Sequence, residues 1–105
     1  MRKLPIPPET KGDERATEMM RVWLAHNDLH VSLMLGMWED AEDSMIQETE
    51  AWGRLLADTV QHIANGLSKS HGFNEQSTVN QIRSSFLEFL KSPEGETTGD
   101  YVDEK

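Results

Sequence analysis

The sequence predicts an α+β fold in which an N-terminal β-hairpin packs against two antiparallel helices. Apolar and polar residues alternate along residues 19–35, which is the period of a half-buried strand, with one polar break at 26–28. Two later segments instead repeat apolar residues at helical spacing. Because only residues 71–74 separate these helices, we expect them to run antiparallel.

The composition allows one small acidic domain and excludes several classes of function. The chain has 105 residues, of which 36% are hydrophobic, and a formal net charge of -9 at pH 7. Without cysteine it forms no disulfide, thiolate nucleophile or cysteine metal site. The acidic balance argues against nucleic-acid partners, which require cations on the protein, and against anionic membrane surfaces.

The sequence also lacks the apolar segments that direct a chain into or across a membrane. No apolar run approaches the ~20 residues of a membrane-spanning helix. The N-terminal residues lack the apolar core of a secretory signal. We therefore expect a cytoplasmic protein with no membrane partner.

The chain divides into an arm, one domain and a tail. Residues 1–16 form an arm, flexible or docked, because three prolines remove backbone donors and disfavour helix. Residues 17–92 form the single α+β domain. Residues 93–105 hold five acids and almost nothing to bury, which predicts a disordered acidic tail.

The hairpin prediction depends on where its turn lies. Asn27 and Asp28 both tolerate a positive φ, so we place the two-residue turn there. All the apolar partners then share one face of the sheet. A single helix over the same residues is the rival interpretation, and the strict alternation disfavours it. The predicted cross-strand pairs are Leu24 with Val31, Val22 with Leu33, and Met20 with Leu35.

The first helix is predicted to run from about Met45 to about Ser70, after a capping-box pattern of Ser44 and Gln47. Gly72 suits the residue that follows its end. We expect two residues of its apolar stripe, Leu56 and Ile63, to be fully buried. The stripe consists of Met45, Trp52, Leu55, Leu56, Val60, Ile63 and Leu67.

The second helix is predicted to begin after Asn74, a favourable N-cap, and Pro93 prevents it from continuing far. Its apolar stripe consists of Val79, Ile82, Phe86, Phe89 and Leu90.

The second hairpin face predicts association. It carries Trp23, Ala25 and Met34, and no third element remains in the chain to cover them. Proteins avoid leaving such a face and two strand edges in water. We therefore expect a homodimer, in which a second copy buries this face by two-fold symmetry and can extend the sheet. In the alternative, Leu4 and Ile6 of the arm fold over Trp23.

One pair of side chains has the spacing of a functional site. Asp58 and His62 lie four residues apart on the first helix, where a carboxylate can orient an imidazole. Trp38 has no evident place in the core. Together these three residues form the candidate ligand-binding set, although an ion pair on the helix flank explains Asp58 and His62 more simply.

The remaining polar clusters favour structural interpretations. His26 and His30 have the four-residue spacing of zinc ligands, but in the hairpin they flank the turn. The acidic stretch at 39–43 lacks the spacing and the glycine of a calcium loop. No phosphate-binding loop or nucleophile motif occurs. We predict no catalytic residue, no metal site and no cofactor.

Three segments carry a resemblance to a known family. They are RVWLAHNDLHVSL at 21–33, GMWED at 36–40 and WGRLLADTVQHIA at 52–64. The chain resembles, over roughly residues 5–70, a family of small bacterial proteins catalogued only as a domain of unknown function. The resemblance implies a compact α+β protein and no known activity.

These observations favour a small acidic protein that is not an enzyme and acts by oligomerisation or by binding a partner. The alternative is a small-ligand or metal-binding module that uses the Asp58 and His62 helix face with Trp38. An enzyme is the least favoured of the three. A ligand site requires a pocket that receives these side chains, whereas an interaction module requires an exposed apolar surface.

Overall fold

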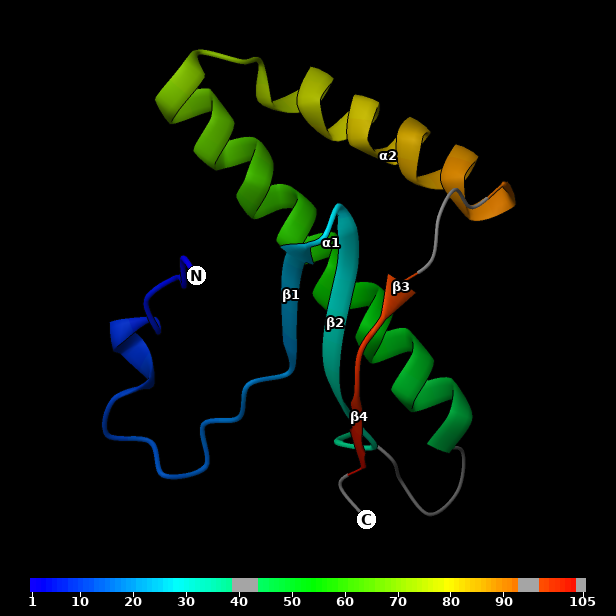
Figure 1. Cartoon of the computed structure of the whole chain (residues 1–105). Helices are drawn as coiled ribbons and strands as arrows, with labels where there is room; N and C mark the ends of the chain where they lie inside the picture. The colour runs from blue at the N-terminus through cyan, green and yellow to red at the C-terminus, as the bar shows by residue number, and fades with distance from the viewer. Residues whose placement is uncertain (39–43, 93–96, 104–105) are drawn as a thin grey trace.

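The structure is a computed structural model that describes residues 1–38, 44–92 and 97–103. It confirms the α+β class, with the hairpin N-terminal and the helices C-terminal (Figure 1). In chain order the elements are a short 3-10 helix at Pro8–Thr10, β1 at Met20–Ala25, β2 at Asp28–Leu35, α1 at Ser44–His71, α2 at Glu75–Lys91, β3 at Thr97–Thr98 and β4 at Tyr101–Asp103.

The hairpin of β1 and β2 forms where the alternation predicts it, but its register differs from the predicted one. Leu24 pairs with Leu29, and Ala25 pairs with Asp28. The turn is therefore His26-Asn27, both with positive φ (54° and 64°), as a tight two-residue hairpin turn requires. The predicted turn at Asn27-Asp28 is wrong. Because the pairing shifts by two residues, the same side chains still share one face.

Two short strands from the tail extend the sheet on the side of β2 away from β1. Both β3 and β4 run parallel to β2, which makes β2 the central strand (Figure 1). The Leu33 N–H donates a hydrogen bond to the Asp100 carbonyl oxygen (3.1 Å). The composition, which predicts a disordered tail, gives no sign of these strands.

The long helix α1 lies across one face of the sheet (Figure 1). Its end at His71 agrees with the predicted role of Gly72, which has a φ of 71° and donates its N–H to the Ser68 carbonyl oxygen (3.0 Å). Its beginning at Ser44 follows residues outside the described ranges. The predicted cap uses the side chain of Ser44, which is not part of the described structure.

The second helix, α2, begins and ends as predicted. The Asn74 side chain accepts a hydrogen bond from the Ser77 N–H (2.9 Å), and the helix ends at Lys91, ahead of Pro93. It packs against the C-terminal half of α1 and then diverges from it (Figure 1). In the described part of the chain, no Cα atom of α2 lies within 8 Å of a strand Cα atom.

The packing leaves almost no core. Among the described residues, Ala64 of α1 is the one hydrophobic side chain that is buried, with 1% of its surface exposed. Leu56 is half-buried and Ile63 is 44% exposed, so the prediction that both are fully buried is wrong. The two helices converge at one end only. Along the rest of α1, which lies against the sheet, the described side chains of the stripe are half-buried or exposed.

Candidate functional site

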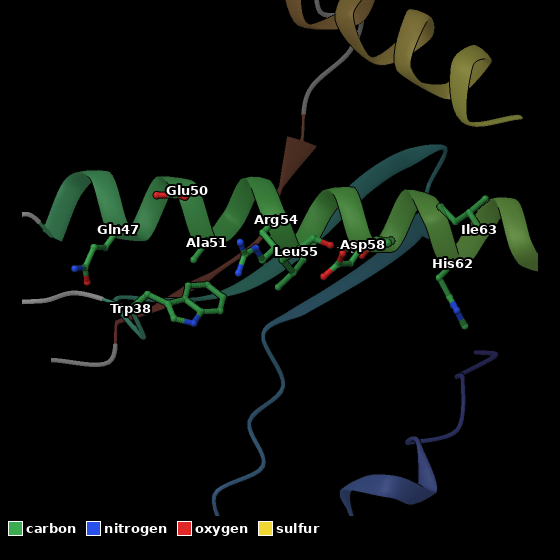
Figure 2. A pocket seen from close by; sticks show the side chains of 10 residues that line it. Trp38, Gln47, Glu50, Ala51, Arg54, Leu55, Asp58, His62 and Ile63 are labelled. Atoms are coloured by element: carbon green, nitrogen blue, oxygen red, sulfur yellow. Dashed lines mark hydrogen bonds between the residues drawn. The ribbon is translucent and has the colours of Figure 1, made fainter. Parts of the chain in front are cut away.

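The candidate site is an open groove of about 920 Å³ along α1. Trp38, which follows β2, forms one end of it, and Figure 2 shows His62 farther along the helix toward the other end. The residues that line the groove are Trp38, Gln47, Glu50, Ala51, Arg54, Leu55, Asp58, Thr59, His62 and Ile63.

The structure brings Trp38, Asp58 and His62 to this one groove, although the three side chains do not contact one another as a cluster. In the described residues, no hydrogen bond or ion pair joins Asp58 to His62, and both side chains are exposed. The guanidinium of Arg54 lies between Trp38 and Asp58 in the view of Figure 2. Sequence reasoning missed Arg54, because a single cation on a solvated helix face gives no signal.

A carboxylate that sequence reasoning also missed fixes the position of Trp38. Glu48 on α1 accepts hydrogen bonds from the backbone N–H groups of Gly36 and Trp38 (both 3.0 Å) and from Nε1 of Trp52 (2.9 Å). The rings of Trp38 and Trp52 meet edge to face, with centroids 5.7 Å apart. Glu48 therefore joins the end of β2 to α1 and holds both indoles in place.

These hydrogen bonds also change the acidity of Glu48. The N–H of Gly36 first, and those of Trp38 and Trp52 with it, hold the pKa of Glu48 below its ordinary value of 4.5. Partial desolvation and the nearby charge of Asp103 oppose this decrease. The carboxylate is thus ionised at neutral pH and acts as an acceptor for three donors.

The groove does not contain a metal-binding arrangement. Within the described ranges, no group of three or more His, Cys, Asp or Glu side chains could hold an ion. Asp58 and His62 supply two donors, whereas a zinc site uses three or four protein ligands. The chemistry that the groove can offer is apolar contact with Trp38 and Leu55, together with the exposed charges of Arg54 and Asp58.

The two hairpin histidines differ in their surroundings. His26 occupies the turn. His30 is half-buried, with Nε2 at 3.0 Å from the Ala25 carbonyl oxygen and Nδ1 at 2.6 Å from Thr98 Oγ1. The carbonyl oxygen can only accept, so Nε2 is the donor in the first of these two hydrogen bonds. His30 therefore joins β3 to the hairpin. The acidic stretch at 39–43 lies outside the described residues.

The side chains predicted for a dimer interface are only partly covered. Trp23 and Met34 are half-buried, and Ala25 is exposed. A second cavity of about 570 Å³ lies between the arm and β1, and Trp23 lines it together with Leu4 and Ile6. Leu4 and Ile6 are themselves 87% and 66% exposed, so most of the surface of both side chains remains open to solvent.

These features define a small α+β protein whose polar side chains line an open groove. The chain belongs to the family described as Domain of unknown function (DUF5076), whose family model matches residues 3–94. In the described ranges, neither helix has the length and apolar character needed to cross a membrane.

Among the solved structures that match, one is similar along nearly the whole chain. It comes from the photosynthetic bacterium Rhodopseudomonas palustrus CGA009 and is described as that of a "putative pyruvate dehydrogenase". The two chains share 28% sequence identity, the match covers 93% of each, and the TM-score is 0.66. No curated protein matches the chain.

Proposed function

We propose that the chain is a non-enzymatic interaction module that works as a homodimer. The observation that carries this proposal is the missing core, since Ala64 is the buried hydrophobic residue of the described chain. A folded domain is stabilised mainly by apolar burial, and this chain buries too little on its own.

The surface area supports the same conclusion. The single chain exposes 9232 Å², whereas a compact protein of 12.0 kDa exposes about 6,000 Å². Its radius of gyration is 15.9 Å, against about 13 Å for a compact chain of this length. Two chains together carry an excess of about 6,000 Å², and obligate dimers bury roughly 2,000–5,000 Å² in total, so a dimer interface would account for most of the excess and the exposed arm for part of the rest.

A second copy is the simplest partner that accounts for this excess. Exposed apolar side chains occur both on the hairpin and on α2, so the two surfaces can pair reciprocally around a two-fold axis. The net charge of -9 opposes association, but salt screens charges that are spread over two surfaces.

Sedimentation equilibrium tests the proposal directly. We expect the wild-type chain to sediment with twice its monomer mass from ~1 to ~100 µM, because an obligate interface has a dissociation constant well below that range. A mass of one chain at ~100 µM would contradict the proposal.

A second candidate function uses the groove of Trp38, Arg54, Asp58 and His62. The similar protein from the photosynthetic bacterium is described by an activity on pyruvate, and a guanidinium such as Arg54 is a natural partner for a small carboxylate. The carboxylates of Glu50 and Asp58 line the same groove and oppose an anion, which places this candidate second.

Isothermal titration with pyruvate tests the second candidate. Binding would appear as a millimolar dissociation constant that Arg54→Gln abolishes and that Arg83→Gln, a matched change on α2, leaves unaltered. No heat from the wild-type chain at ~10 mM pyruvate would reject it.

A further inference from the structure

The distal half of α2 presents an apolar surface that this chain does not cover. Near α1, Val79 and Ile82 are half-buried. Beyond them the helices diverge (Figure 1), and Phe86, Phe89 and Leu90 are 47%, 52% and 63% exposed. These three residues, the distal α2 patch, continue the same helical stripe as Val79 and Ile82.

A second uncovered apolar surface lies on the hairpin. Val22 and Leu24 of β1 and Leu29 of β2 are 48%, 80% and 36% exposed. Leu24 pairs directly with Leu29, and Val22 lies two residues away on the same face. We refer to these three residues as the hairpin patch. On that face of β2, Val31, Leu33 and Leu35 are half-buried, so the uncovered strip follows β1 and the hairpin turn.

The two patches do not cover each other in the single chain, because each of the six side chains keeps at least 36% of its surface exposed. In the described residues, every Cα of α2 lies more than 8 Å from every strand Cα. Both patches are nevertheless apolar. The distal α2 patch is a ridge of aromatic and leucine side chains on a helix, and the hairpin patch is a strip of aliphatic side chains on a sheet. A helix ridge laid on such a strip is the usual way in which an α+β protein completes its layers.

We propose that the distal α2 patch of one copy packs on the hairpin patch of a second copy, and that the contact occurs twice around a two-fold axis. This inference rests on the proposed homodimer and names the surfaces that form it. Each copy then supplies a second helix to the sheet of the other copy, in addition to that sheet's own α1. Six apolar side chains per chain lose their exposure, and the interface is larger than one formed by the sheets alone.

The hairpin patch is a better docking surface than the face of Trp23 and Met34. Those two side chains are already half-buried, whereas Leu24 is 80% exposed. The hairpin patch also carries no charged side chain, so the acidic net charge of two copies does not meet inside the contact.

Disulfide trapping tests the contact, because the chain has no native cysteine. Oxidation of an equimolar mixture of Leu24→Cys and Phe89→Cys should give a covalent dimer. A disulfide requires Cα atoms within about 7 Å, so these two positions cannot be bridged inside one chain. Ser84→Cys, on the opposite side of α2, mixed with Leu24→Cys should stay uncrosslinked.

The outcomes separate the contact from the dimer itself. A wild-type dimer whose Leu24→Cys and Phe89→Cys mixture stays monomeric on a denaturing gel overturns the contact and leaves the dimer. Crosslinking of Ala25→Cys alone also overturns the contact, because it places the partner on the opposite hairpin face. A wild-type monomer at ~100 µM overturns both.

A pair of charge variants gives a second measurement that does not depend on oxidation. Phe89→Glu should raise the dimer dissociation constant at least ~100-fold, because it places a carboxylate inside the contact. Ser84→Glu adds the same charge outside the contact and should leave the constant within about threefold of wild type. Equal effects of the two variants would show that net charge, and not the contact, controls association.

Discussion

Glu48 is the residue on which the region around the candidate groove depends most. Its two carboxylate oxygens accept from two backbone N–H groups after β2 and from the Trp52 indole. These donors would otherwise be left without a partner between the helix and the end of the strand, which is costly for a half-buried group. A glutamine has one accepting oxygen and cannot replace both carboxylate oxygens.

Glu48→Gln should lower the thermal midpoint at neutral pH and weaken its dependence on acid. The folded pKa of Glu48 lies below the ordinary value of 4.5, so its contribution to stability is complete above that value. The contribution is lost as the pH falls through the folded pKa. Circular dichroism melts at about pH 7 and about pH 3 should show that wild type loses more stability than the variant.

Glu50→Gln is the matched control, since Glu50 is exposed on the same helix. It should melt close to wild type at neutral pH. If Glu50→Gln and Glu48→Gln gave the same midpoint and the same acid dependence, the hydrogen bonds of Glu48 would not stabilise the fold. Near-ultraviolet circular dichroism adds a specific signal, because Glu48→Gln should loosen the Trp38–Trp52 pair.

At the scale of elements, the start of α2 depends on one capping side chain. Asn74→Ala removes the acceptor of the Ser77 N–H and should lower the free energy of unfolding by about 1 kcal/mol. Urea titration measures this change. Asn74→Asp keeps an acceptor oxygen and should restore most of the loss, whereas equal destabilisation by both variants would show that the cap contributes little.

The docking of the tail on β2 depends on Gly99. Its φ is 146°, and a Cβ there would collide with the backbone of Val31. Gly99→Ala should therefore detach β3 and β4 and release the Leu33 N–H from the Asp100 carbonyl. Amide exchange of Leu33 should accelerate about fivefold or more, the factor for roughly 1 kcal/mol.

Gly12→Ala is the control for this substitution. Gly12 also has a positive φ, of 91°, but a Cβ there meets no atom within 4 Å. It should leave the exchange of Leu33 unchanged. Unaltered exchange in Gly99→Ala would show that the tail strands do not protect β2.

The sequence predicts those elements whose signals are local. Alternation from Met20 to Leu35 predicts both strands, and the residues Gly72 and Asn74 predict the end of one helix and the start of the next. The hairpin register is missed because three consecutive polar residues could form the turn, and only backbone geometry selects His26-Asn27. The tail strands are missed because they depend on pairing with residues about 68 positions away.

At the scale of the whole molecule, stability and association should be one property. Because folding and dimerisation are linked, raising the protein from ~1 to ~100 µM should raise the thermal midpoint by roughly 5–10 °C. Differential scanning calorimetry at the two concentrations measures this shift. A midpoint that does not change with concentration would show that the single chain is stable by itself.

The candidate groove is predictable from the sequence only in part, because some of its residues share one helix and others meet only in the folded chain. Asp58 and His62 share one helix face by spacing alone, and the structure places both in the groove. The neighbouring Arg54 and the hydrogen bonds of Glu48 depend on where the residues after β2 meet α1. The spacing of apolar residues along the sequence does not predict this contact between the residues after β2 and α1. The incorrect burial predicted for Ile63 has the same origin, because helical spacing identifies an apolar stripe without showing what covers it.

The tail strands have a consequence for how the protein behaves when it is crowded. Without β3 and β4, the free edge of β2 would offer the unpaired backbone of Leu33, Met34 and Leu35 to any other chain, which is a template for ordered aggregation. The strand that occupies this edge is short and brings Asp100 and Asp103 with it. Edge charges of this kind halt further strand addition. The acidic tail therefore ends the growth of the sheet and protects the solubility of a chain with many exposed apolar side chains.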